Sequence, residues 1–415
     1  MRRKPLCAIR SQATVCYSSA TDKASLVVDS SPRDAHNHMT RLLVLFEYAT
    51  LNGGERSWLT TLDEIRRAGF EVTAAAPRAG PVAEELARRD VPLLAIEFHD
   101  SSGRRRELGD LRASLAEMIA SHGTQLLHAN SLNMSRLSGP VARASGIASL
   151  GYLRDILKLR RAAIEDLNCH RRLLAVSCAT RDYHIAQGLE PDRVEVCHNG
   201  VDLVRFRPRP PTGYLHRELG IPTTAPLIGT IGQIGLRKGL DVLIESAAKL
   251  MRHWQSDTPA PHFLIIGERH SQKEESIRFE QQLHEAASIP PLKGQVHFLQ
   301  WRSDIPDLLA ELTLLVHPAR QEPLGRVLLE AAAAGVAILA TDVGGTREIF
   351  PSDQESARLV PPGDSNELRV ALAQLLQNTA LREQLPRNAR RRICQAFDGS
   401  AAAHRLIAHY RSILD

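Results

Sequence analysis

Hydrophobic and polar positions alternate along most of the chain in the manner of strand–helix–strand units. An apolar run at 42–46 precedes a Gly-Gly turn, and a helical pattern then ends at Gly69, directly before a second apolar run at 70–76. The apolar face of this predicted helix carries Trp58, Leu59, Leu62 and Ile65. Such alternation is typical of βαβ units and of a parallel sheet.

The same alternation fills two blocks of the chain. In the first block, further strands are predicted at 93–97, 125–129, 148–153, 173–176 and 194–197. In the second, strands are predicted at 227–231, 262–266, 296–299, 313–316 and 337–341, and helices at 239–253, 274–287, 304–311 and 325–334. The Pro-rich segment 208–213 between the blocks suits neither a helix nor a central strand and predicts a linker. We therefore expect two doubly wound α/β domains that face a cleft, where ligands bind beyond the carboxyl ends of the strands.

The patterning also sets the expected domain limits. Residues 1–38 show no apolar period and no apolar segment of a signal peptide, so we predict a disordered tail there. The first domain is predicted at 39–210 and the second at 211–395. A C-terminal helix at 396–415 is expected to pack back on the first domain. Because Met39 directly precedes the first strand, a natural translation start at this residue is an alternative.

Composition narrows the function classes. The chain has 415 residues, 43% hydrophobic and 24% charged, which fits two to three folded domains at roughly 150 residues each. The net charge of +5 suits anionic ligands or lipid headgroups but is too small for DNA binding, and 4% aromatic residues argue against a platform for single-stranded nucleic acid. Six widely spaced cysteines without C-x-x-C indicate a reduced, cytoplasmic protein without a zinc site. No apolar run reaches the roughly 20 residues of a membrane-spanning helix.

The most informative stretch follows the strand that ends at His317. We place Pro323 in the first turn of the next helix, where its missing N–H costs nothing. The free backbone N–H groups near Leu324 and Gly325 would then suit a phosphate.

Two carboxylates frame this stretch. Glu322 and Glu330 are eight residues apart, which is about 12 Å along a helix. That exceeds the roughly 5–9.5 Å between two carboxylates that act on one glycosidic bond. We therefore expect the two acids to hold opposite ends of an extended ligand. A surface loop before an ordinary core helix is the structural alternative.

A glycine-rich loop, G-T-I-G-Q-I-G-L-R-K-G, follows the strand at 227–231. Gly232 and the adjacent cations Arg237 and Lys238 make it a reasonable seat for a diphosphate whose charge grows as it departs. The spacing differs from the G-x-G-x-x-G dinucleotide fingerprint, and the expected acidic ribose ligand is missing, which disfavours a dehydrogenase. A solvated loop is the structural alternative.

The first block contributes candidates from the other side of the cleft. The backbone of Gly53 and Gly54 can approach an anion closely, or the pair can simply form a tight turn. Polar residues at strand ends are placed to meet a second substrate: His128, Asn130, Arg154 and Asp155. For His128 a structural role in the core is the alternative. The turn at Asn199-Gly200 is interpreted as architecture.

Together these runs resemble the retaining glycosyltransferases of family 4 (GT4), which have the two-domain GT-B fold. The E-x7-E phrase of that family is matched by His317-Pro318, Glu322-Pro323-Leu324-Gly325, Glu330-Ala331, Gly335, Ala340-Thr341, Gly344-Gly345 and Glu348-Ile349. Weaker support comes from Gly53-Gly54, Asn199-Gly200-Val201-Asp202, Lys238-Gly239 and the run at 360–364.

The resemblance implies transfer of a hexosyl or related group from a nucleotide-diphosphate sugar to an acceptor hydroxyl, without a cofactor and without a metal. By analogy, Glu330 holds the ribose hydroxyls, and Glu322 holds the sugar. The implied catalytic residues are Glu322, Lys238 and Arg154. The implied donor-binding residues are Glu330, Leu324, Gly325, Arg237, Gly53, Gly54 and Gly232, and the acceptor-side residues are His128, Asn130 and Asp155.

Two departures from the family pattern leave alternatives open. Gln233 stands where the family usually has an arginine, and Arg154 stands where a histidine is frequent. A nucleotide-sugar-binding protein that has lost transfer is therefore an alternative. A nucleotide-sugar epimerase, which has the same fold but needs acid and base residues across the cleft, is a second alternative. The acceptor is a glycan, a lipid-linked molecule or a small molecule, as in polysaccharide biosynthesis. Basic clusters at 104–106 and 154–172 suit an anionic lipid or peripheral contact with the inner membrane face, or form a solvated surface.

Overall fold

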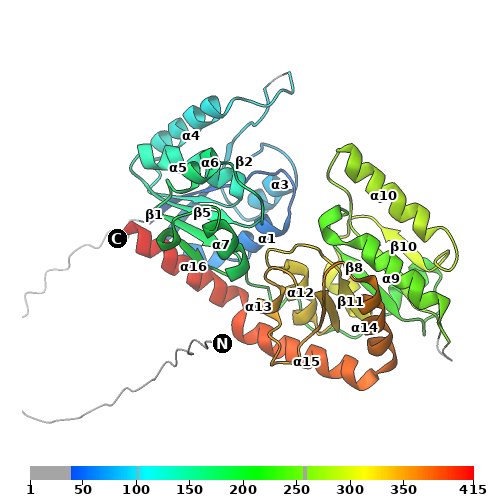
Figure 1. The fold of residues 1–415 in the computed structure, drawn as a ribbon. Helices are drawn as coiled ribbons and strands as arrows, with labels where there is room; N and C mark the ends of the chain where they lie inside the picture. Colours follow the sequence, from blue (N-terminus) through cyan, green and yellow to red (C-terminus); the bar gives the residue numbers. More distant parts are fainter. Residues whose placement is uncertain (1–38, 101, 256–258) are drawn as a thin grey trace, which may run out of the picture. The chain divides into compact units, whose positions relative to one another are not determined.

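Two parallel sheets organise the computed structural model, which describes residues 39–415 except 101 and 256–258 (Figure 1). The described residues form one compact unit. The predicted tail at 1–38 lies outside the described residues. A translation start at Met39 stays a prediction. The alternation of strands and helices confirms the α/β class predicted from the sequence.

The first sheet has the strand order β3-β2-β1-β4-β5-β6-β7, and all its pairs are parallel. Its strands are β1 (Thr40–Leu45), β2 (Phe70–Ala76), β3 (Leu93–Ala95), β4 (Leu126–Ala129), β5 (Ala148–Leu153), β6 (Arg172–Ala175) and β7 (Val194–Val196). Its helices are α1 (Gly53–Leu59), α2 (Leu62–Arg67), α3 (Pro81–Arg88), α4 (Leu108–His122), α5 (Leu132–Ala144), α6 (Arg161–Leu167) and α7 (Cys178–Ile185). β5 is buried along its whole length, as expected of a strand covered by helices on both faces.

The second sheet has the order β10-β9-β8-β11-β12-β13 and is also parallel. Its strands are β8 (Leu227–Ile231), β9 (His262–Ile266), β10 (Val296–Leu299), β11 (Leu314–His317), β12 (Ile338–Thr341) and β13 (Arg358–Val360). The helices of this half are α8 (Tyr214–Leu219), α9 (Leu240–Arg252), α10 (Glu274–Ala287), α11 (Ile305–Glu311), α12 (Arg326–Ala334), α13 (Thr346–Ile349), α14 (Ser365–Gln377) and α15 (Thr379–Ala396). The chain ends with α16 (Gly399–Leu414), which packs on the first half. The short β13 and the helices α14 and α15 were not predicted.

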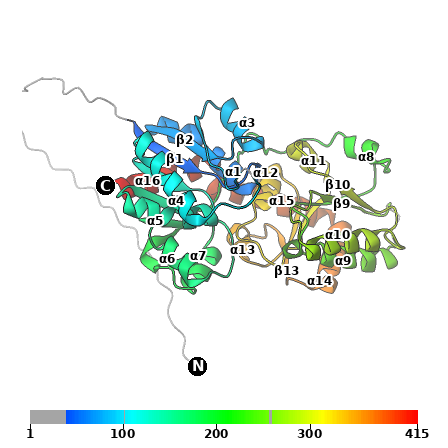
Figure 2. The ribbon, with the colours of Figure 1, turned by 90° about the horizontal axis from the view of Figure 1, so that it is seen from above.

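Both sheets reverse their strand order at one point, between β1 and β4 and between β8 and β11. Side chains that follow these strands meet at the carboxyl edge of each sheet, where open α/β sheets bind ligands. Figure 2 shows α1 of the first half beside α12 of the second half, and these helices follow β1 and β11. The switch points of the two sheets therefore contribute to one region.

Two predicted helices differ from the observed ones. The helix after Gly53 is divided into α1 and α2, because the hydroxyls of Thr60 and Thr61 bond to the carbonyls of Arg56 and Trp58. The helix after β11 begins only at Arg326, since the preceding Gly325 has a φ of 102°.

Pro323 is therefore a loop residue, and the prediction that it lies in the first helical turn is wrong. Glu322 is also outside the helix, so the helical estimate of 12 Å does not describe the distance between Glu322 and Glu330.

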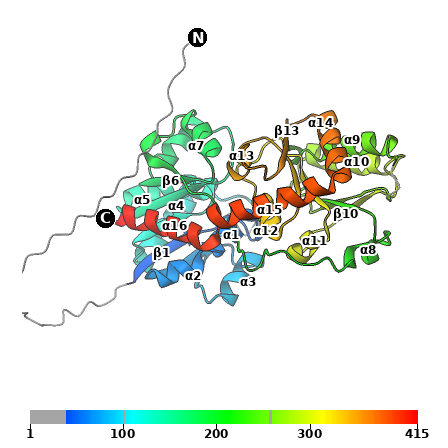
Figure 3. The same ribbon diagram turned by 90° about the horizontal axis from the view of Figure 1, so that it is seen from below.

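The last helix returns to the first half of the molecule. Figure 3 shows α15 and α16 running in succession from the second sheet to the first, and α16 packs against α2 and β5. The entry to α16 is tied to the segment after β7 by a parallel bridge between Val201 and Asp398. The domain limits drawn from the sequence stay predictions. The linker segment 208–213 contains neither helix nor strand. No helix in the described ranges combines the length and apolar character needed to cross a bilayer.

Candidate active site

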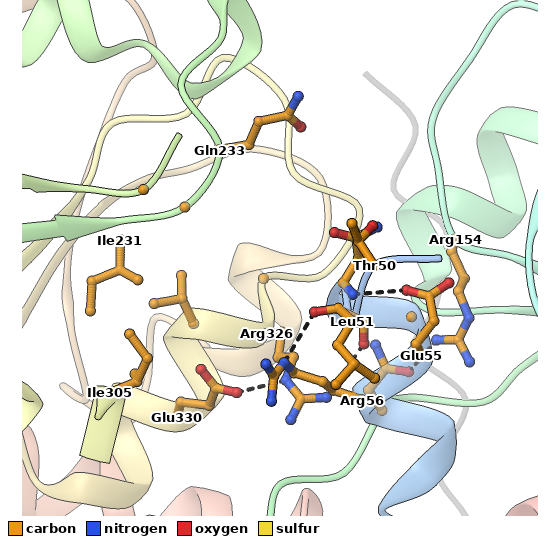
Figure 4. Close-up of a pocket in the computed structure, with 18 of the residues that line it drawn as sticks. Thr50, Leu51, Glu55, Arg56, Arg154, Ile231, Gln233, Ile305, Arg326 and Glu330 are labelled. Carbon is orange, nitrogen blue, oxygen red and sulfur yellow. Dashed lines mark hydrogen bonds and ion pairs between the residues drawn. The ribbon is translucent and has the colours of Figure 1, made fainter. Parts of the chain in front are cut away.

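A cleft of about 840 Å³ lies between the carboxyl edges of the two sheets. Its walls come from the segments after β1, β4, β5, β8 and β11, and a neighbouring cavity of about 950 Å³ shares part of the lining. The volume lies within the usual range of small-molecule sites. Figure 4 shows the two walls, with Ile231 and Gln233 opposite Leu51 and Glu55.

Glu322 is the most strongly paired acid of the second wall. Its Oε2 atom is 2.6 Å from Lys238 Nζ and 2.8 Å from His317 Nε2. Burial raises the pKa of the carboxyl, but Lys238, His317 and Arg237 together outweigh burial and hold the pKa well below its usual range. Glu322 is therefore ionised. Within the described part of the chain no donor is bonded to Oε1, which can accept a hydrogen bond from a substrate hydroxyl.

Close backbone packing holds the Glu322 loop in place. The amide of Gly345 donates to the Glu322 carbonyl over 3.1 Å. A Cβ atom on Gly344 would lie 1.9 Å from the same carbonyl oxygen, and Gly344 has a φ of 52°. The Gly-Gly pair after β12 is therefore required by the close approach of two backbones.

The glycine-rich loop delivers the cations of the same wall. A short 3₁₀ turn at Leu236–Lys238 follows the loop. The next residue, Gly239, lies so close to Pro318 that a Cβ atom on Gly239 would be 2.0 Å from the Pro318 carbonyl oxygen. Gly232, Gln233 and Arg237 line the cleft, and Arg237 is exposed there. The structure thus brings the two predicted diphosphate cations to the Glu322 carboxylate.

Leu324 and Gly325 lie in the turn that leads into α12. Both line the cleft, and no acceptor is bonded to their amides among the residues that the structure describes. Because they precede a helix of nine residues, these amides point where a helix dipole favours negative charge.

Glu330 lies one turn into α12 and has a partner that the sequence did not reveal. Arg326 Nε donates to Glu330 Oε1 over 2.6 Å (Figure 4). Arg326 Nη1 also donates to Ser57 Oγ of α1 over 3.1 Å. Glu330 is nearly buried but lines the cleft. The spacing of four residues along a helix is a signal for such a pair.

On the first wall, Arg154 is held by four groups. Its Nε donates to the Asn130 carbonyl (2.9 Å), its Nη2 to Asn130 Oδ1 (2.8 Å) and its Nη1 to Asn199 Oδ1 (2.8 Å). The guanidinium also lies 3.8 Å from the centre of the Tyr152 ring. Burial lowers the pKa of Arg154. Asn199, interpreted from the sequence as part of a turn, is thus also a partner of a site residue.

The glycines after β1 make room for this arginine. Gly53 and Gly54 begin α1 and line the cleft, and a Cβ atom on Gly54 would lie 3.0 Å from Arg154 Cδ. A side chain at Gly54 would require Arg154 to shift by a few tenths of an ångström. Asn52 and Glu55 cap this helix in a reciprocal manner.

Carboxylates with raised pKa values stand beside Arg154. Burial raises the pKa of Glu55 and of Asp155. Arg154 lowers the pKa of Glu55, and Arg237 of the opposite wall lowers that of Asp155, but neither outweighs burial. Glu47, which sequence reasoning missed, accepts from Ser131 Oγ and Asn133 Nδ2, each over 2.7 Å.

His128 does not line the cleft. Its side chain is fully buried, and its Nδ1 atom accepts from the Tyr410 hydroxyl over 2.7 Å. Trp58 Nε1 donates to the same hydroxyl over 3.3 Å. Burial, with Arg154, lowers the pKa of His128 to about 3, so the ring is neutral. The acceptor-side placement of His128 is therefore wrong for this structure, and the structural alternative describes it.

The described residues contain no group of three or more His, Cys, Asp or Glu side chains that could hold a metal ion. Arg237 and Lys238 line the cleft together with Glu322.

Comparisons with known proteins show which families and relatives the chain matches. The model of the family described as Glycosyl transferases group 1 matches residues 214–392, and that of Glycosyltransferase Family 4 matches residues 51–205. The chain is 27% identical over 364 residues to D-inositol 3-phosphate glycosyltransferase 1 of Catenulispora acidiphila, covering 82% of this chain and 85% of that protein. It is also 27% identical over 240 residues to the lipopolysaccharide glucosyltransferase WaaG of Escherichia coli, covering 57% of this chain and 61% of that protein.

Solved structures share the fold. The complex of Anabaena Alr3699/HepE with UDP and glucose matches with a TM-score of 0.78 and 21% identity, covering 90% of this chain and 100% of that one. WaaG matches with a TM-score of 0.66 and 18% identity, covering 89% of this chain and 99% of that one. Two family models side by side, a relative over most of the length and two sheets of the GT-B type lead to one conclusion: the chain is a glycosyltransferase that belongs to the group 1 glycosyltransferases of family 4.

Proposed function

We propose that this enzyme is a retaining glycosyltransferase that moves a sugar from a uridine-diphosphate sugar to an acceptor hydroxyl. The observation that carries the proposal is the ionised Glu322, which is held by Lys238 and His317 and has a free oxygen at the cleft. The HepE structures that share the fold contain UDP and UDP-glucose, which supports a uridine donor.

In the proposed reaction, each group of the second wall has one task. Glu322 accepts a hydrogen bond from a hydroxyl of the transferred sugar, and Glu330 accepts from the ribose. Lys238, with Arg237 and the amides of the α12 turn, stabilises the charge that develops on the leaving diphosphate. These cations supply the charge that a metal would otherwise supply, so we propose a reaction without metal or cofactor.

The acceptor hydroxyl attacks the anomeric carbon from the face that the diphosphate leaves. The new bond forms between the acceptor oxygen and the anomeric carbon as the bond from that carbon to the phosphate oxygen breaks. The departing phosphate oxygen takes the proton of the hydroxyl, so configuration is retained without a separate base. Arg154, Asn130 and Asp155 belong to the wall where we place the acceptor.

A thermal-shift panel with UDP-, GDP-, ADP- and TDP-sugars tests the proposal. We expect the largest rise in melting temperature with a UDP-sugar, because a ligand that binds only the folded state stabilises it. No shift with any of the four nucleotides would contradict the proposal. Product analysis with labelled donor then distinguishes transfer to an acceptor from epimerisation of the donor sugar and from binding without reaction.

We also propose peripheral contact with an anionic membrane through the loop between β5 and α6. Leu157 is 51% exposed there, next to the exposed cations Lys158 and Arg160. The predicted cluster at 154–172 is smaller than expected, because Arg154 faces the cleft and Arg171 and Arg172 bond to the Ile413 carbonyl and to Glu195. Flotation with phosphatidylglycerol vesicles at low salt tests this contact, and an unbound protein would exclude it.

A further inference from the structure

Three arginines from three separate segments meet where the cleft joins the neighbouring cavity. Arg56 belongs to α1, Arg205 to the segment between β7 and α8, and Arg326 to the start of α12. All three line both cavities. Figure 4 shows Arg56 and Arg326 side by side, with Glu330 directed toward Arg326. We refer to these three residues as the arginine cluster.

The members of the arginine cluster are not equally paired. Arg326 is neutralised by Glu330 over 2.6 Å and also donates to Ser57. Arg56 uses only its Nε atom, which donates to the Leu51 carbonyl over 3.1 Å. Among the residues that the structure describes, no acceptor is bonded to the terminal nitrogens of Arg56 or to the side chain of Arg205. Two guanidinium groups at the cavity therefore have free donors.

Three arginines and one carboxylate, Glu268, are the Arg, Lys, Asp and Glu residues that line both cavities among those described, so positive charge is in excess where the cavities join. Burial lowers the pKa of Arg56 most, and Arg326 and Arg205 lower it further. Glu330 and Glu85 act in the opposite direction, but each acts less than either arginine. Holding like charges together in a partly buried place costs free energy that an anion would recover.

We propose that Arg56 and Arg205, with Arg326 behind them, form a binding subsite for a phosphate group. The planar fork of a guanidinium matches two oxygens of a phosphate, and two such forks from different segments can hold one phosphate from two sides. The subsite extends the proposed function, because Arg326 also holds the carboxylate to which we assign the ribose. It names the substrate class as one with a phosphate, on the acceptor or as a free co-ligand.

Phosphate binding by the full-length chain tests the subsite directly. Inorganic phosphate is titrated by calorimetry into protein with and without saturating UDP, at constant ionic strength, because exposed charges are screened by salt. The variants are Arg56→Gln/Arg205→Gln and, as a control, Arg161→Gln, whose side chain is 93% exposed on α6. We expect the double variant to bind phosphate about tenfold or more weakly and the control to match the wild type.

Equal phosphate affinity in the wild type and the double variant would overturn the subsite, as would no binding by the wild type. The measurement is separate from the test of the proposed function. If UDP does not bind, the proposed function fails while the titration without UDP still tests the subsite. If UDP binds and the arginine variants behave like the wild type, only the subsite fails.

Transfer assays distinguish the two sources of the phosphate. Inositol and an inositol phosphate serve as a matched acceptor pair with UDP-glucose as donor. If the acceptor carries the phosphate, we expect Arg205→Gln to raise KM about tenfold for the inositol phosphate only. Inorganic phosphate should then compete with this acceptor. If the phosphate is instead a free co-ligand, we expect inorganic phosphate to change kcat with unphosphorylated inositol, and Arg205→Gln to remove this effect. Insensitivity of both acceptors to phosphate and to the substitution would overturn the proposal.

Discussion

The two walls of the cleft hold their charges in different ways. On the second wall, Glu322 and Glu330 each pair with a cation over 2.6 Å. On the first wall, Arg154 is bonded to amide and carbonyl oxygens, and no ion pair holds it among the described residues. The carboxyl pKa of Glu322 is lowered, whereas those of Glu55 and Asp155 are raised by burial. One wall is thus organised around fixed anions, and the other around one fixed cation.

Replacing Glu322 should give the largest effect, because it removes the fixed anion. We expect Glu322→Gln to lower transfer by about 100-fold to 1000-fold, in the range seen when one charge-stabilising contact is lost. Steady-state kinetics with a UDP-sugar measures the loss. Glu383→Gln is the matched control, since its carboxylate pairs with Arg387 on an exposed face of α15. Near-normal turnover of Glu322→Gln would contradict the role given to the second wall.

Releasing Arg154 should have a smaller effect on transfer. Asn199→Ala removes one partner, at Nη1, and leaves both bonds to Asn130. We expect transfer to fall about tenfold through KM for the acceptor, because a misplaced cation costs about one charge-assisted hydrogen bond. Donor affinity by calorimetry should stay unchanged. A loss of donor affinity instead would place Arg154 with the second wall.

The walls should respond to pH with opposite signs. The folded pKa of Glu322 lies below the value of about 4.3 in an unfolded chain, so its contribution to stability is present above that pH and is lost on acidification. The folded pKa of Glu55 is raised, so its contribution is lost as pH rises through that value.

Urea unfolding at two pH values checks these signs. From pH 4 to pH 7, Glu322→Gln should become less stable relative to the wild type, and Glu55→Gln more stable. The same sign of change in both variants would remove the electrostatic difference between the walls.

The smallest effect on transfer is expected for Tyr410, which lies in the core behind the first wall. Tyr410→Phe removes the hydroxyl that bonds to His128 and Trp58 in the core. We expect a loss of about 1–2 kcal/mol in the free energy of unfolding, with unchanged transfer, since these side chains do not line the cleft. Denaturant unfolding and kinetics on the same preparation measure both quantities. A change in kcat would show that the core bond acts on the cleft.

The sequence predicted more of the second wall than of the first wall. The second wall rests on a short loop and one helix, so its spacing was visible in the stretch from His317 to Glu330. The strands at 70–76, 148–153, 227–231 and 262–266 match the observed ones, because buried parallel strands give continuous apolar runs.

The first wall could not be predicted in this way. Arg154 meets Asn130 and Asn199 from segments 24 and 45 residues away, and no local pattern records such a contact. His128 was predicted to lie near the cleft because it stands at the end of a strand. Whether a side chain at a strand end faces the cleft or the core depends on what packs behind it. Here Tyr410 of α16 lies behind it. The pair of Arg326 and Glu330 has a local spacing of four residues, but this spacing is common on exposed helix faces and does not by itself indicate a site.

The tie between Val201 and the entry to α16 has a mechanical consequence. Val201 N donates to the Phe397 carbonyl over 2.9 Å, and Gly399 N donates to the Val201 carbonyl over 3.0 Å. The two segments that connect the halves of the molecule are thus joined by backbone hydrogen bonds. Sliding of one segment along the other would break both backbone hydrogen bonds, so any displacement of the halves that keeps these bonds carries the two connections together.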